Sequence, residues 1–462
     1  MLPPYDPWLT GSVSFDVSMA TRAGPSALAE RRRRRLVALL ERAHERSPRY
    51  RRILAGRDPK HARLQDLPIA HKRELMDDFE DWVGDAALDR GALERFCADR
   101  RRIAEPFRER YVVWESSGST GEPAIFVQDA AAMAVYDALE ALRRPGLRAA
   151  QRWLDPWGLN DRTVFLGAVG GHFASNVSVE RLRRLNPLLA KRLHAVSFLQ
   201  PLDDLRRALE RHEPTVLATY PSAAVLLAEE KLAGRLRIAP KEIWTGGETL
   251  TPAMRRHIHE AFGCPVVNSY GASEFLALAS ECNEGRMHVN SDWAVLEAVD
   301  EAGRAVGRGT MGARTLLTNL ANHVQPIIRY DLGDRVRIEA DTCPCGSHLP
   351  VIDVEGRADD TLHLAARASK RRSVLPLALS TVLEEAGLFD FQLVQRGPAE
   401  LELRTAQKGL GAEAALRRGR SALAAFLDSQ GADGVDIRCQ PGEPLACGRS
   451  GKVRRVIAAE DA

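Results

Sequence analysis

The sequence lacks an uninterrupted apolar stretch long enough to cross a membrane, and Met1 to Trp8 lack the basic segment and apolar run of a secretory signal. It also lacks a strong charge of one sign: 65 basic and 62 acidic side chains leave a net charge of +3, too small for a typical nucleic-acid binder. Cysteines are few, and their odd number of seven argues against a disulfide framework. We therefore expect a soluble, cytoplasmic protein with reduced thiols and without membrane or nucleic-acid partners.

One local excess of charge is the arginine run Arg31 to Arg35. Apolar residues between Leu36 and Ala43 follow it at helical spacing. A helix with a solvated basic face explains this pattern better than a contact with nucleic acid or lipid.

The chain is longer than one compact domain usually is. Up to about residue 110 the apolar positions recur three and four residues apart, which predicts a helical lead-in. From Thr163 onward, short apolar runs alternate with helical stretches, as in parallel strands joined by crossover helices. The expected strands are 164–169, 216–220, 242–245 and 265–269, and the expected helices include 202–211 and 223–233.

One of these helices has clear limits. Thr251 is a suitable N-cap, Pro252 suits the first turn, and Gly263 can end the helix in the left-handed conformation. From His288 to Ile338 strand-like runs follow one another with Gly and Asp turns, which indicates an antiparallel or barrel-like part.

The predicted fold class is therefore α/β, with parallel sheets, crossover helices and a β-barrel-like subdomain in a large N-terminal domain, followed by a small, mobile α+β C-terminal domain. The expected limits are 1–358 for the large domain and 359–462 for the small one. Within the large domain we expect a helical lead-in at 1–110, an α/β part at 111–285 and a β-rich part at 286–356.

The strongest functional pattern is an eight-residue loop that follows the apolar run 111–114. Its glycines let the backbone approach an oxyanion and its hydroxyls donate further hydrogen bonds, so polyphosphate is the natural ligand. The Gly-Lys-Ser/Thr ending of a Walker loop is missing, and the loop alone leaves a plain flexible turn as an equal alternative. The loop reads Ser116, Ser117, Gly118, Ser119, Thr120, Gly121, Glu122 and Pro123.

Four later segments follow this loop in order. They are Tyr270-Gly271-Ala272-Ser273-Glu274, Arg329-Tyr330-Asp331-Leu332-Gly333-Asp334, Gly356-Arg357-Ala358-Asp359-Asp360 and Gly451-Lys452-Val453-Arg454-Arg455. In order and spacing the set resembles the adenylate-forming superfamily of acyl-CoA synthetases. More narrowly it resembles the phenylacetate-CoA ligase branch, through Arg46-Ser47-Pro48-Arg49-Tyr50, Leu67-Pro68-Ile69-Ala70-His71-Lys72, Thr245-Gly246-Gly247-Glu248, Pro326-Ile327-Ile328-Arg329-Tyr330 and Cys343-Pro344-Cys345-Gly346.

The resemblance implies ATP and Mg²⁺ as ligands and gives the matching residues their roles. Ser116 to Gly121 would hold the β- and γ-phosphates, and Glu274 would help to bind Mg²⁺. Asp334 would bind the ribose hydroxyls, and Arg357 would lie near the ribose and α-phosphate. Further nucleotide contacts are implied at Gly247, Glu248, Ser269, Tyr270, Gly271, Ala272 and Ser273.

The same resemblance makes Lys452 the catalytic cation. It would reach the substrate carboxylate and the α-phosphate from the mobile C-terminal domain, with Asp359 as the hinge. Because the carboxylate is itself the nucleophile, catalysis reduces to positioning and to neutralising charge on the transferred phosphate.

An acyl pocket is expected between the strand that ends near Val169 and the loop at Gly246. A flat aryl acid suits such a site, with glycine backbones on one side and an aromatic wall on the other. His172 is a candidate catalytic gate or carboxylate contact, with a satisfied core histidine as an equal alternative. The expected lining residues are Gly170, Gly171, Phe173, Tyr220 and Gly246.

The sequence leaves more than one acyl acceptor open. CoA is the acceptor that the resemblance implies, but the run from Thr361 to Arg372 lacks the glycine that related CoA ligases carry in the pantetheine tunnel. An amine or hydroxyl of a second small molecule, or a carrier-protein thiol, remains an alternative acceptor. A catalytically inactive nucleotide-binding relative is a third alternative, and the oligomeric state stays open, with a homodimer among the options.

Two pairs of metal-binding side chains predict a structural zinc site. Cys343 and Cys345 lie on one tight turn, and Cys282 with His288 provides a second pair upstream. Four soft or borderline ligands suit tetrahedral Zn²⁺, and buried thiols with a satisfied histidine are the alternative.

Overall fold

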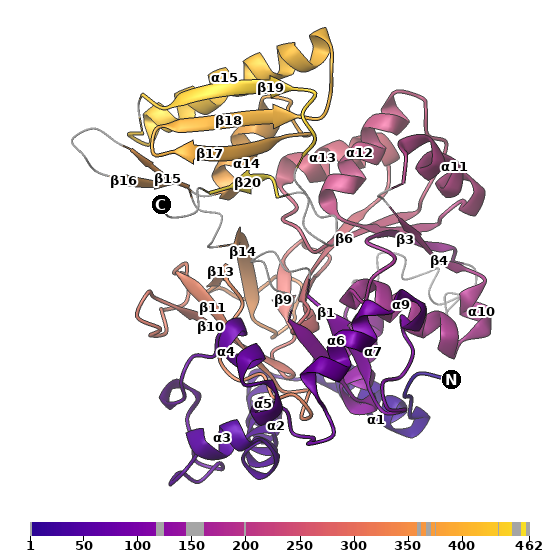
Figure 1. Cartoon of the computed structure of the whole chain (residues 1–462), viewed down its shortest axis with the longest axis vertical. Helices are drawn as coiled ribbons and strands as arrows, with labels where there is room; N and C mark the ends of the chain where they lie inside the picture. Colours follow the sequence, from indigo (N-terminus) through magenta and orange to yellow (C-terminus); the bar gives the residue numbers. More distant parts are fainter. Residues whose placement is uncertain are drawn as a thin grey trace.

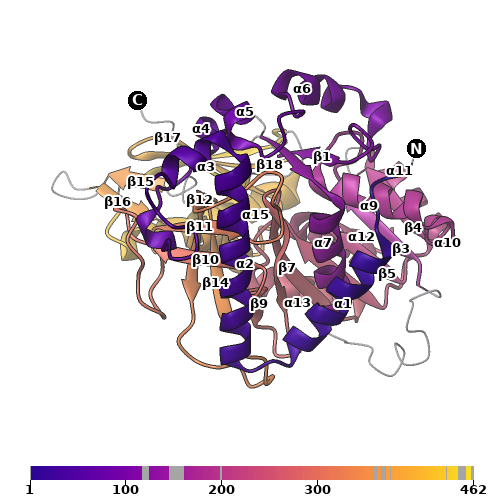
Figure 2. The ribbon, with the colours of Figure 1, turned by 90° about the horizontal axis from the view of Figure 1, so that it is seen from below.

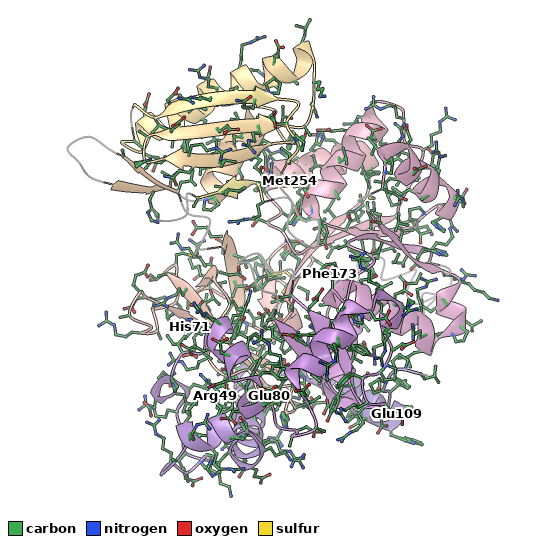
Figure 3. All side chains as sticks on the ribbon, in the orientation of Figure 1. Arg49, His71, Glu80, Glu109, Phe173 and Met254 are labelled. Atoms are coloured by element: carbon green, nitrogen blue, oxygen red, sulfur yellow. The ribbon has the colours of Figure 1, made fainter. Side chains whose placement is uncertain are left out.

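The computed structural model describes residues 2–116, 124–144, 161–197, 200–357, 362–365, 371–374, 376–432, 434–445 and 454–458. In Figure 1 the C-terminal elements lie at the top, above a central sheet, and the helices of the N-terminal part lie at the bottom. Figure 3 shows the side chains on the same view, with Phe173 near the middle of the molecule and Met254 just below the C-terminal elements.

The lead-in is helical, as its periodicity predicts. Its α-helices are α1 (Pro7–Thr21), α2 (Pro25–Arg46), α3 (Pro48–Ile53), α4 (Lys72–Asp77), α5 (Phe79–Trp82) and α6 (Arg90–Ala98), with short 3₁₀ turns at Leu64–Asp66 and Arg100–Arg102. Figure 2 shows α1 running beside α7 (Ala130–Leu142) and the long α2 crossing the face of the molecule.

The arginine run lies on α2, but only part of it forms the solvated face that the sequence predicts. Arg33 and Arg34 are 66% and 67% exposed. Arg31 and Arg35, one helical turn apart, are 22% and 16% exposed and both pair with Asp16 of α1. The expectation is therefore wrong for these two residues, because their shared face packs against a second helix.

Arg35 also belongs to a buried ionic cluster. Its guanidinium lies 3.4 Å from the ring centre of Trp293 and 2.6 Å from the carbonyl of Asp292. The carboxylate of Asp292 is fully enclosed and accepts hydrogen bonds of 2.6 and 2.8 Å from Arg143, which follows α7. Removing one partner would leave a buried charge unpaired, so the cluster fixes the relative placement of α2, α7 and the chain at residues 292–293.

The central sheet has nine strands in the order β13-β14-β9-β8-β7-β6-β5-β3-β4. The predicted parallel strands are all present. The five neighbouring strands β7, β6, β5, β3 and β4 all run parallel to one another. Their bounds are β3 (Thr163–Gly167), β4 (Leu193–Ser197), β5 (Val216–Thr219), β6 (Glu242–Gly246) and β7 (Val266–Ala272). The other half, β8 (Phe275–Glu281), β9 (Met287–Val289), β13 (Asp334–Ile338) and β14 (Val351–Arg357), is antiparallel.

Helices connect the parallel strands, as the sequence rhythm predicts. They are α9 (Ala174–Leu185), α10 (Pro187–Ala190), α11 (Leu202–His212), α12 (Pro221–Leu232) and α13 (Pro252–Phe262). The limits of α13 confirm the sequence signals: the Thr251 hydroxyl accepts from the amide of Met254 at 3.2 Å, and Gly263 adopts φ 66°.

The β-rich part divides between two sheets. Strands β10 (Ala294–Val299), β11 (Arg314–Asn319) and β12 (Tyr330–Asp331) form a three-stranded antiparallel sheet, whereas β13 joins the nine-stranded sheet. Backbone hydrogen bonds connect the two sheets, from Gly309 to Ile338 at 2.7 Å and from Gly312 to Val336 at 3.0 Å. A hairpin of β1 (Val112–Glu115) and β2 (Ile125–Gln128) precedes α7.

The C-terminal elements have their own apolar core. A hairpin of β15 (Leu362–Ala365) and β16 (Arg371–Val374) comes first, followed by α14 (Pro376–Glu385) and α15 (Leu410–Ser429) on a sheet ordered β19-β18-β17-β20. The strands of this sheet are β17 (Gln392–Gly397), β18 (Glu400–Thr405), β19 (Asp436–Pro441) and β20 (Val456–Ile457).

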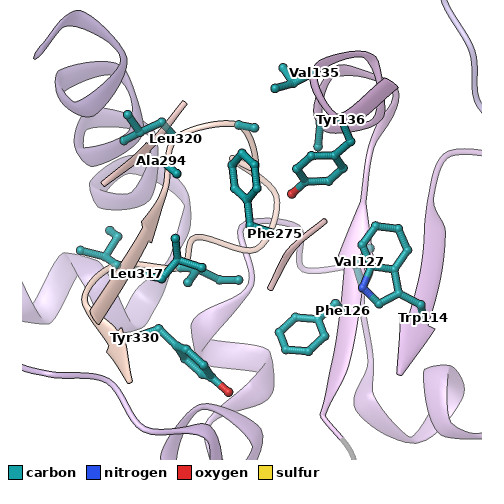
Figure 4. Close-up of a cluster of buried hydrophobic side chains, with 14 of the residues drawn as sticks. Trp114, Phe126, Val127, Val135, Tyr136, Phe275, Ala294, Leu317, Leu320 and Tyr330 are labelled. Atoms are coloured by element: carbon teal, nitrogen blue, oxygen red, sulfur yellow. The ribbon is translucent and has the colours of Figure 1, made fainter. Parts of the chain in front are cut away.

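The largest core lies where the β1–β2 hairpin, α7 and the β-rich part meet. Figure 4 shows Trp114, Tyr136 and Phe275 in this core, with the rings of Tyr136 and Phe275 5.0 Å apart at 72°. Trp114 and Phe275 are fully buried. Truncating such a side chain costs about 3–5 kcal/mol, so this core holds rigidly the elements that carry the candidate site. Among the described residues, no helix is both long and apolar enough to span a bilayer.

Candidate active site

The predicted pocket residues meet at one edge of the central sheet. Strands β3, β5, β6 and β7 are parallel, so their carboxyl ends lie together. The predicted residues follow or end each strand: Gly170–Phe173 after β3, Tyr220 after β5, Gly246 at the end of β6, and Ser269–Ala272 at the end of β7. The carboxyl edge of an open α/β sheet is the usual place for ligands.

Two glycines at this edge are required by close packing. A Cβ on Gly271 would lie 2.0 Å from the carbonyl oxygen of Leu276, and a Cβ on Gly246 would lie 2.9 Å from Ser269 Oγ. Gly247 adopts a φ of +76°, a left-handed conformation that favours glycine. The backbone near the ends of β6 and β7 therefore adopts conformations and close contacts that larger residues would not allow.

Three predicted nucleotide contacts come together from distant strands. The Tyr270 hydroxyl, on β7, donates to Asp334 Oδ2 at 2.6 Å, and Asp334 on β13 pairs in register with Arg357 on β14. Both Tyr270 and Asp334 are half-buried, so one side of the pair is open to solvent. This arrangement offers a fixed carboxylate acceptor for hydroxyl groups of a ligand.

Glu274 lies in the tight turn between β7 and β8, and side chains from other elements hold this turn. Trp114 donates to the carbonyl of Ser273 at 2.8 Å, and Asn319 donates to the carbonyl of Glu274 at 2.8 Å. The same Asn319 amide also lies 2.9 Å from the Tyr136 hydroxyl and is fully buried. Glu274 is half-buried, and its carboxylate is the hard oxygen ligand that Mg²⁺ prefers.

Sequence reasoning missed Asn319 as a positioning residue. The available signal was an asparagine between the apolar pairs Leu316–Leu317 and Leu320–Ala321, where a buried side chain without a partner would be costly.

The residues that flank the predicted phosphate loop are also firmly held. The Ser116 hydroxyl accepts from the amide of Ala124 at 2.9 Å, and the Ser116 amide donates to the carbonyl of Ala124 at 2.8 Å. The side-chain amide of the fully buried Gln325 pairs with the backbone of β2. It accepts a hydrogen bond from the Val127 amide at 2.8 Å and donates one to the Ile125 carbonyl at 2.9 Å. Both ends of the loop therefore leave a rigid hairpin.

Several predicted residues lie outside the described part of the chain. These are the loop residues Ser117, Gly118, Ser119, Thr120 and Gly121, the hinge residue Asp359 and the catalytic candidate Lys452.

The structure places His172 in the protein core. Its side chain is fully buried, its ring centre lies 5.1 Å from that of Phe96, and Nε2 lies 3.2 Å from the carbonyl of Asp99. Burial lowers the pKa of this imidazole, which favours the neutral form. The enclosed position agrees with the alternative of a core histidine rather than with a gate at the pocket mouth.

Tyr220, which follows β5, is also buried. Burial and the charge of Glu248 raise the pKa of Tyr220 to about 12, so its hydroxyl keeps its proton. Glu248 in turn accepts a 3.1 Å hydrogen bond from the amide of Ser222, in the first turn of α12. Phe173 is half-buried, and its ring would be 2.6 Å from a Cβ on Gly171. Glycine at this position lets the aromatic ring lie flat against the backbone.

The predicted metal ligands form a cluster. One ligand atom from each of Cys282, His288, Cys343 and Cys345 lies within 4.8 Å of all the others. The sulfurs of Cys282 and Cys343 are 3.7 Å apart, and Cys345 Sγ is 3.4 Å from His288 Nε2. A tetrahedral zinc ion with bonds of about 2.0–2.3 Å would separate these pairs by roughly 3.8 and 3.6 Å.

The tautomer of His288 also suits a metal. Its Nδ1 lies 2.9 Å from the carbonyl of Leu349, which can only accept, so Nδ1 carries the proton and Nε2 is left as the ligand. The donor set and spacing thus fit a closed structural site.

Comparison with known proteins agrees with this geometry. The sequence profile of the AMP-binding enzyme family matches residues 111–313. The chain is 30% identical over 355 residues to the phenylacetate-coenzyme A ligase of Thermus thermophilus, which covers 73% of this chain and 71% of the relative. The chain belongs to the phenylacetate-CoA ligase branch of the adenylate-forming enzymes.

Solved structures support the fold. The structure of 2-hydroxyisobutyryl-CoA ligase in its postadenylation state superimposes with a TM-score of 0.67 at 22% identity, over 92% of this chain and 88% of that one. The same ligase in its thioesterification state gives a TM-score of 0.58 over 95% and 91%. The chain therefore shares the α/β architecture of that ligase over most of its length.

Proposed function

We propose that this protein activates a small carboxylic acid with ATP, forming acyl-AMP and pyrophosphate, and then transfers the acyl group to CoA. The observation that carries the proposal is the convergence of Tyr270, Asp334 and Glu274 at the carboxyl edge of the sheet, in a member of the adenylate-forming enzymes. Asp334 is far in the sequence from Tyr270 and Glu274, which belong to one segment, and both segments match motifs of the family.

The residues at this edge suggest where each part of ATP would bind. Asp334, fixed by Tyr270, would accept the ribose hydroxyls, and the loop from Ser116 to Gly121 would bind the β- and γ-phosphates from its rigid hairpin. Arg357 pairs in register with Asp334, which supports a place for it near the ribose and α-phosphate. Further contacts are proposed at Gly247, Glu248, Ser269, Gly271, Ala272 and Ser273.

The adenylation step needs no general base, because the ionised carboxylate is itself the nucleophile. A carboxylate oxygen of the acid bonds to the α-phosphorus while the bond to pyrophosphate breaks. In the second step the thiol of CoA gives up its proton to solvent, and its sulfur bonds to the carbonyl carbon while AMP leaves. Glu274 would hold Mg²⁺, which neutralises phosphate charge when bound. Lys452 would supply the second positive charge, so the protein contributes position and electrostatic stabilisation.

A division into two domains would suit this scheme. We propose that residues 1–358 hold the nucleotide and that residues 359–462 rotate about Asp359 between the two steps. The separate apolar core of the C-terminal elements favours movement as a unit. The better superposition on a postadenylation state than on a thioesterification state supports an adenylation-side arrangement for the present structure.

An aromatic acid is the proposed substrate class. Gly170 has open space beside its backbone, while Phe173, which lies against Gly171, and the protonated Tyr220 would provide an aromatic wall with one hydroxyl group.

One feature favours a different acceptor as the second candidate function. The hairpin of β15 and β16 follows the proposed hinge, and its Leu362 and Leu364 are fully buried in the C-terminal core. The run from 361 to 372 contains no glycine. An amine, a hydroxyl or a carrier-protein thiol would then accept the acyl group in place of CoA.

Exchange of labelled pyrophosphate into ATP tests the first step. We expect exchange that depends on a carboxylic acid and is fastest with benzoic, phenylacetic or cinnamic acid in a panel that includes aliphatic acids. No exchange with any acid would leave only nucleotide binding.

The acceptor is tested with the acid that gives exchange. Adding CoA should yield a thioester and free AMP. Accumulated acyl-AMP that only an amine, alcohol or carrier protein consumes would instead support the second candidate.

Lys452→Ala tests the catalytic cation, and exposed Lys408→Ala is the matched control. The first variant should lose exchange while ATP still binds, and the control should retain both. Unchanged exchange in Lys452→Ala would exclude the proposed role.

A further inference from the structure

A buried ion pair lies where the C-terminal elements contact α13. Glu384, at the end of α14, pairs with Arg455, and their side chains are 0% and 14% exposed. In Figure 3 the labelled Met254, in the first turn of α13, lies at this boundary. An ion pair at such a depth requires partners on both sides, because a buried charge without them is costly.

Those partners come from the N-terminal part. One carboxylate oxygen of Glu384 accepts from the hydroxyl of Thr251, and the other accepts from Arg455. Thr251 is itself buried and caps α13 through the amide of Met254. Arg455 Nη1 also lies 3.7 Å from the sulfur of Met254. The contact therefore joins two C-terminal side chains to the first turn of one N-terminal helix.

The position of Glu384 gains a further electrostatic interaction in this arrangement. Its carboxylate faces the N-terminus of α13, where unpaired amides concentrate positive partial charge. If the C-terminal elements rotated away, Glu384 and Arg455 would move together but would lose Thr251 and Met254.

Arg455 is held rigidly within the C-terminal elements. Its Nη2 donates to the carbonyl of Phe389 at 2.8 Å, and its guanidinium lies 4.1 Å from the ring centre of Phe391. The backbone carbonyl of Arg455 accepts from Leu393 at 2.8 Å, at the start of the β17–β20 pairing. This residue therefore anchors the chain at the start of β20.

Both ends of the contact adjoin proposed catalytic segments. Thr251 comes three residues after Glu248 in the loop that follows β6, and Arg455 comes three residues after Lys452. Three residues span at most about 11 Å of extended chain. Glu384 links Arg455 to Thr251, so the contact ties the chain at Arg455 to the chain that follows Glu248.

We infer that Thr251, Glu384 and Arg455 form an interdomain latch that stabilises the adenylation arrangement and positions the segment carrying Lys452. The inference rests on the proposed function for its kinetic consequence. The three are positioning residues: the latch acts on the first step through the placement of the C-terminal elements.

The kinetic test compares the two steps in Glu384→Gln and Thr251→Val. Thr251→Val removes a hydrogen bond to the charged Glu384, and Glu384→Gln removes the charge itself. Each variant should slow acid-dependent pyrophosphate exchange about tenfold. Thioester formation from supplied acyl-AMP and CoA should stay within about twofold of wild type, since that step does not use the latched arrangement. Thr251→Ser keeps the cap and the hydroxyl and should retain normal exchange.

Glu400→Gln is the matched control, because Glu400 forms a surface pair of 2.9 Å with Arg438 on the same C-terminal sheet. It should change neither step. Equal losses in both steps in Glu384→Gln, or no loss in either, would overturn the latch.

A measurement without catalysis separates this inference from the proposed function. Backbone hydrogen exchange in Glu384→Gln should increase in the first turn of α13 and at residues 389–393, and remain as in wild type in the core of α15. No increase there would overturn the latch. Increased hydrogen exchange in a protein whose wild type lacks pyrophosphate exchange with every acid would support the latch and refute the proposed function.

Discussion

The hydroxyl of Tyr270 donates a hydrogen bond of 2.6 Å to Asp334 Oδ2. Sixty-four residues separate the two positions in the chain, and the bond fixes the carboxylate that we assign to the ribose. Pre-organising this acceptor lowers the cost of binding ATP, because the side chain does not have to be ordered by the ligand.

Tyr270→Phe tests this relationship. We expect the KM for ATP in the exchange assay to rise about tenfold, the effect of losing a hydrogen bond to a charged group. The melting temperature should change little, since the ring stays in place. Tyr5→Phe is the control, because Tyr5 is 50% exposed in the N-terminal segment. An unaltered KM in Tyr270→Phe would separate Asp334 from ATP binding.

Gly271→Ala should be far more damaging than its size suggests. The new Cβ would be placed 2.0 Å from the carbonyl oxygen of Leu276, so the turn that carries Glu274 has to move. We expect the free energy of unfolding to fall by more than about 2 kcal/mol and pyrophosphate exchange to be lost. Urea denaturation measures the first effect. Gly307→Ala, with no atom within 4 Å of its Cβ, should be neutral in both assays.

Metal analysis tests the cysteine and histidine cluster. The purified protein should contain one zinc per chain, and chelation should lower its melting temperature, because the metal joins residues 282–288 to 343–345. Cys345→Ser should reduce the zinc content. Cys439→Ser, whose thiol lies outside the cluster, should retain it. A wild-type protein that is folded and free of zinc would refute the site.

Glu229 predicts a pH dependence of stability. Burial, and then the negative charges of Asp390 and Glu230, raise the pKa of Glu229 from 4.5 to about 7, against the opposing effect of Arg235. The folded state therefore binds this proton more tightly than the unfolded state. The contribution of Glu229 to stability is fully present below pH 4.5 and is lost as the pH rises through about 7.

Glu229→Gln should accordingly be more stable than wild type at pH 8, and the difference should shrink at pH 5. Thermal unfolding at both pH values measures this difference, and effects of other groups cancel in the comparison. Asp390 lies in the C-terminal part, so Asp390→Asn should lessen the same pH dependence. A constant difference between Glu229→Gln and wild type across this pH range would contradict the assigned pKa.

The sequence by itself determined the elements and the family. Thr251, Pro252 and Gly263 gave the limits of α13, because caps and helix ends depend on local backbone chemistry. The alternation of apolar runs and helical stretches predicted the parallel half of the central sheet, because this pattern is also local in the sequence. The ordered motifs indicated the branch of adenylate-forming enzymes, since each carries a residue type that its chemistry requires.

Only the tertiary structure decided which residues share an environment. In the folded protein His172 lies in the core, and Arg31 and Arg35 pack against a second helix. Asn319 donates a hydrogen bond to the turn that carries Glu274. It also brought two cysteine and histidine pairs together and placed Thr251 against Glu384. These contacts join residues far apart in the chain. The burial and the partners of these side chains depend on how the elements pack, so no periodic pattern in the sequence predicts them.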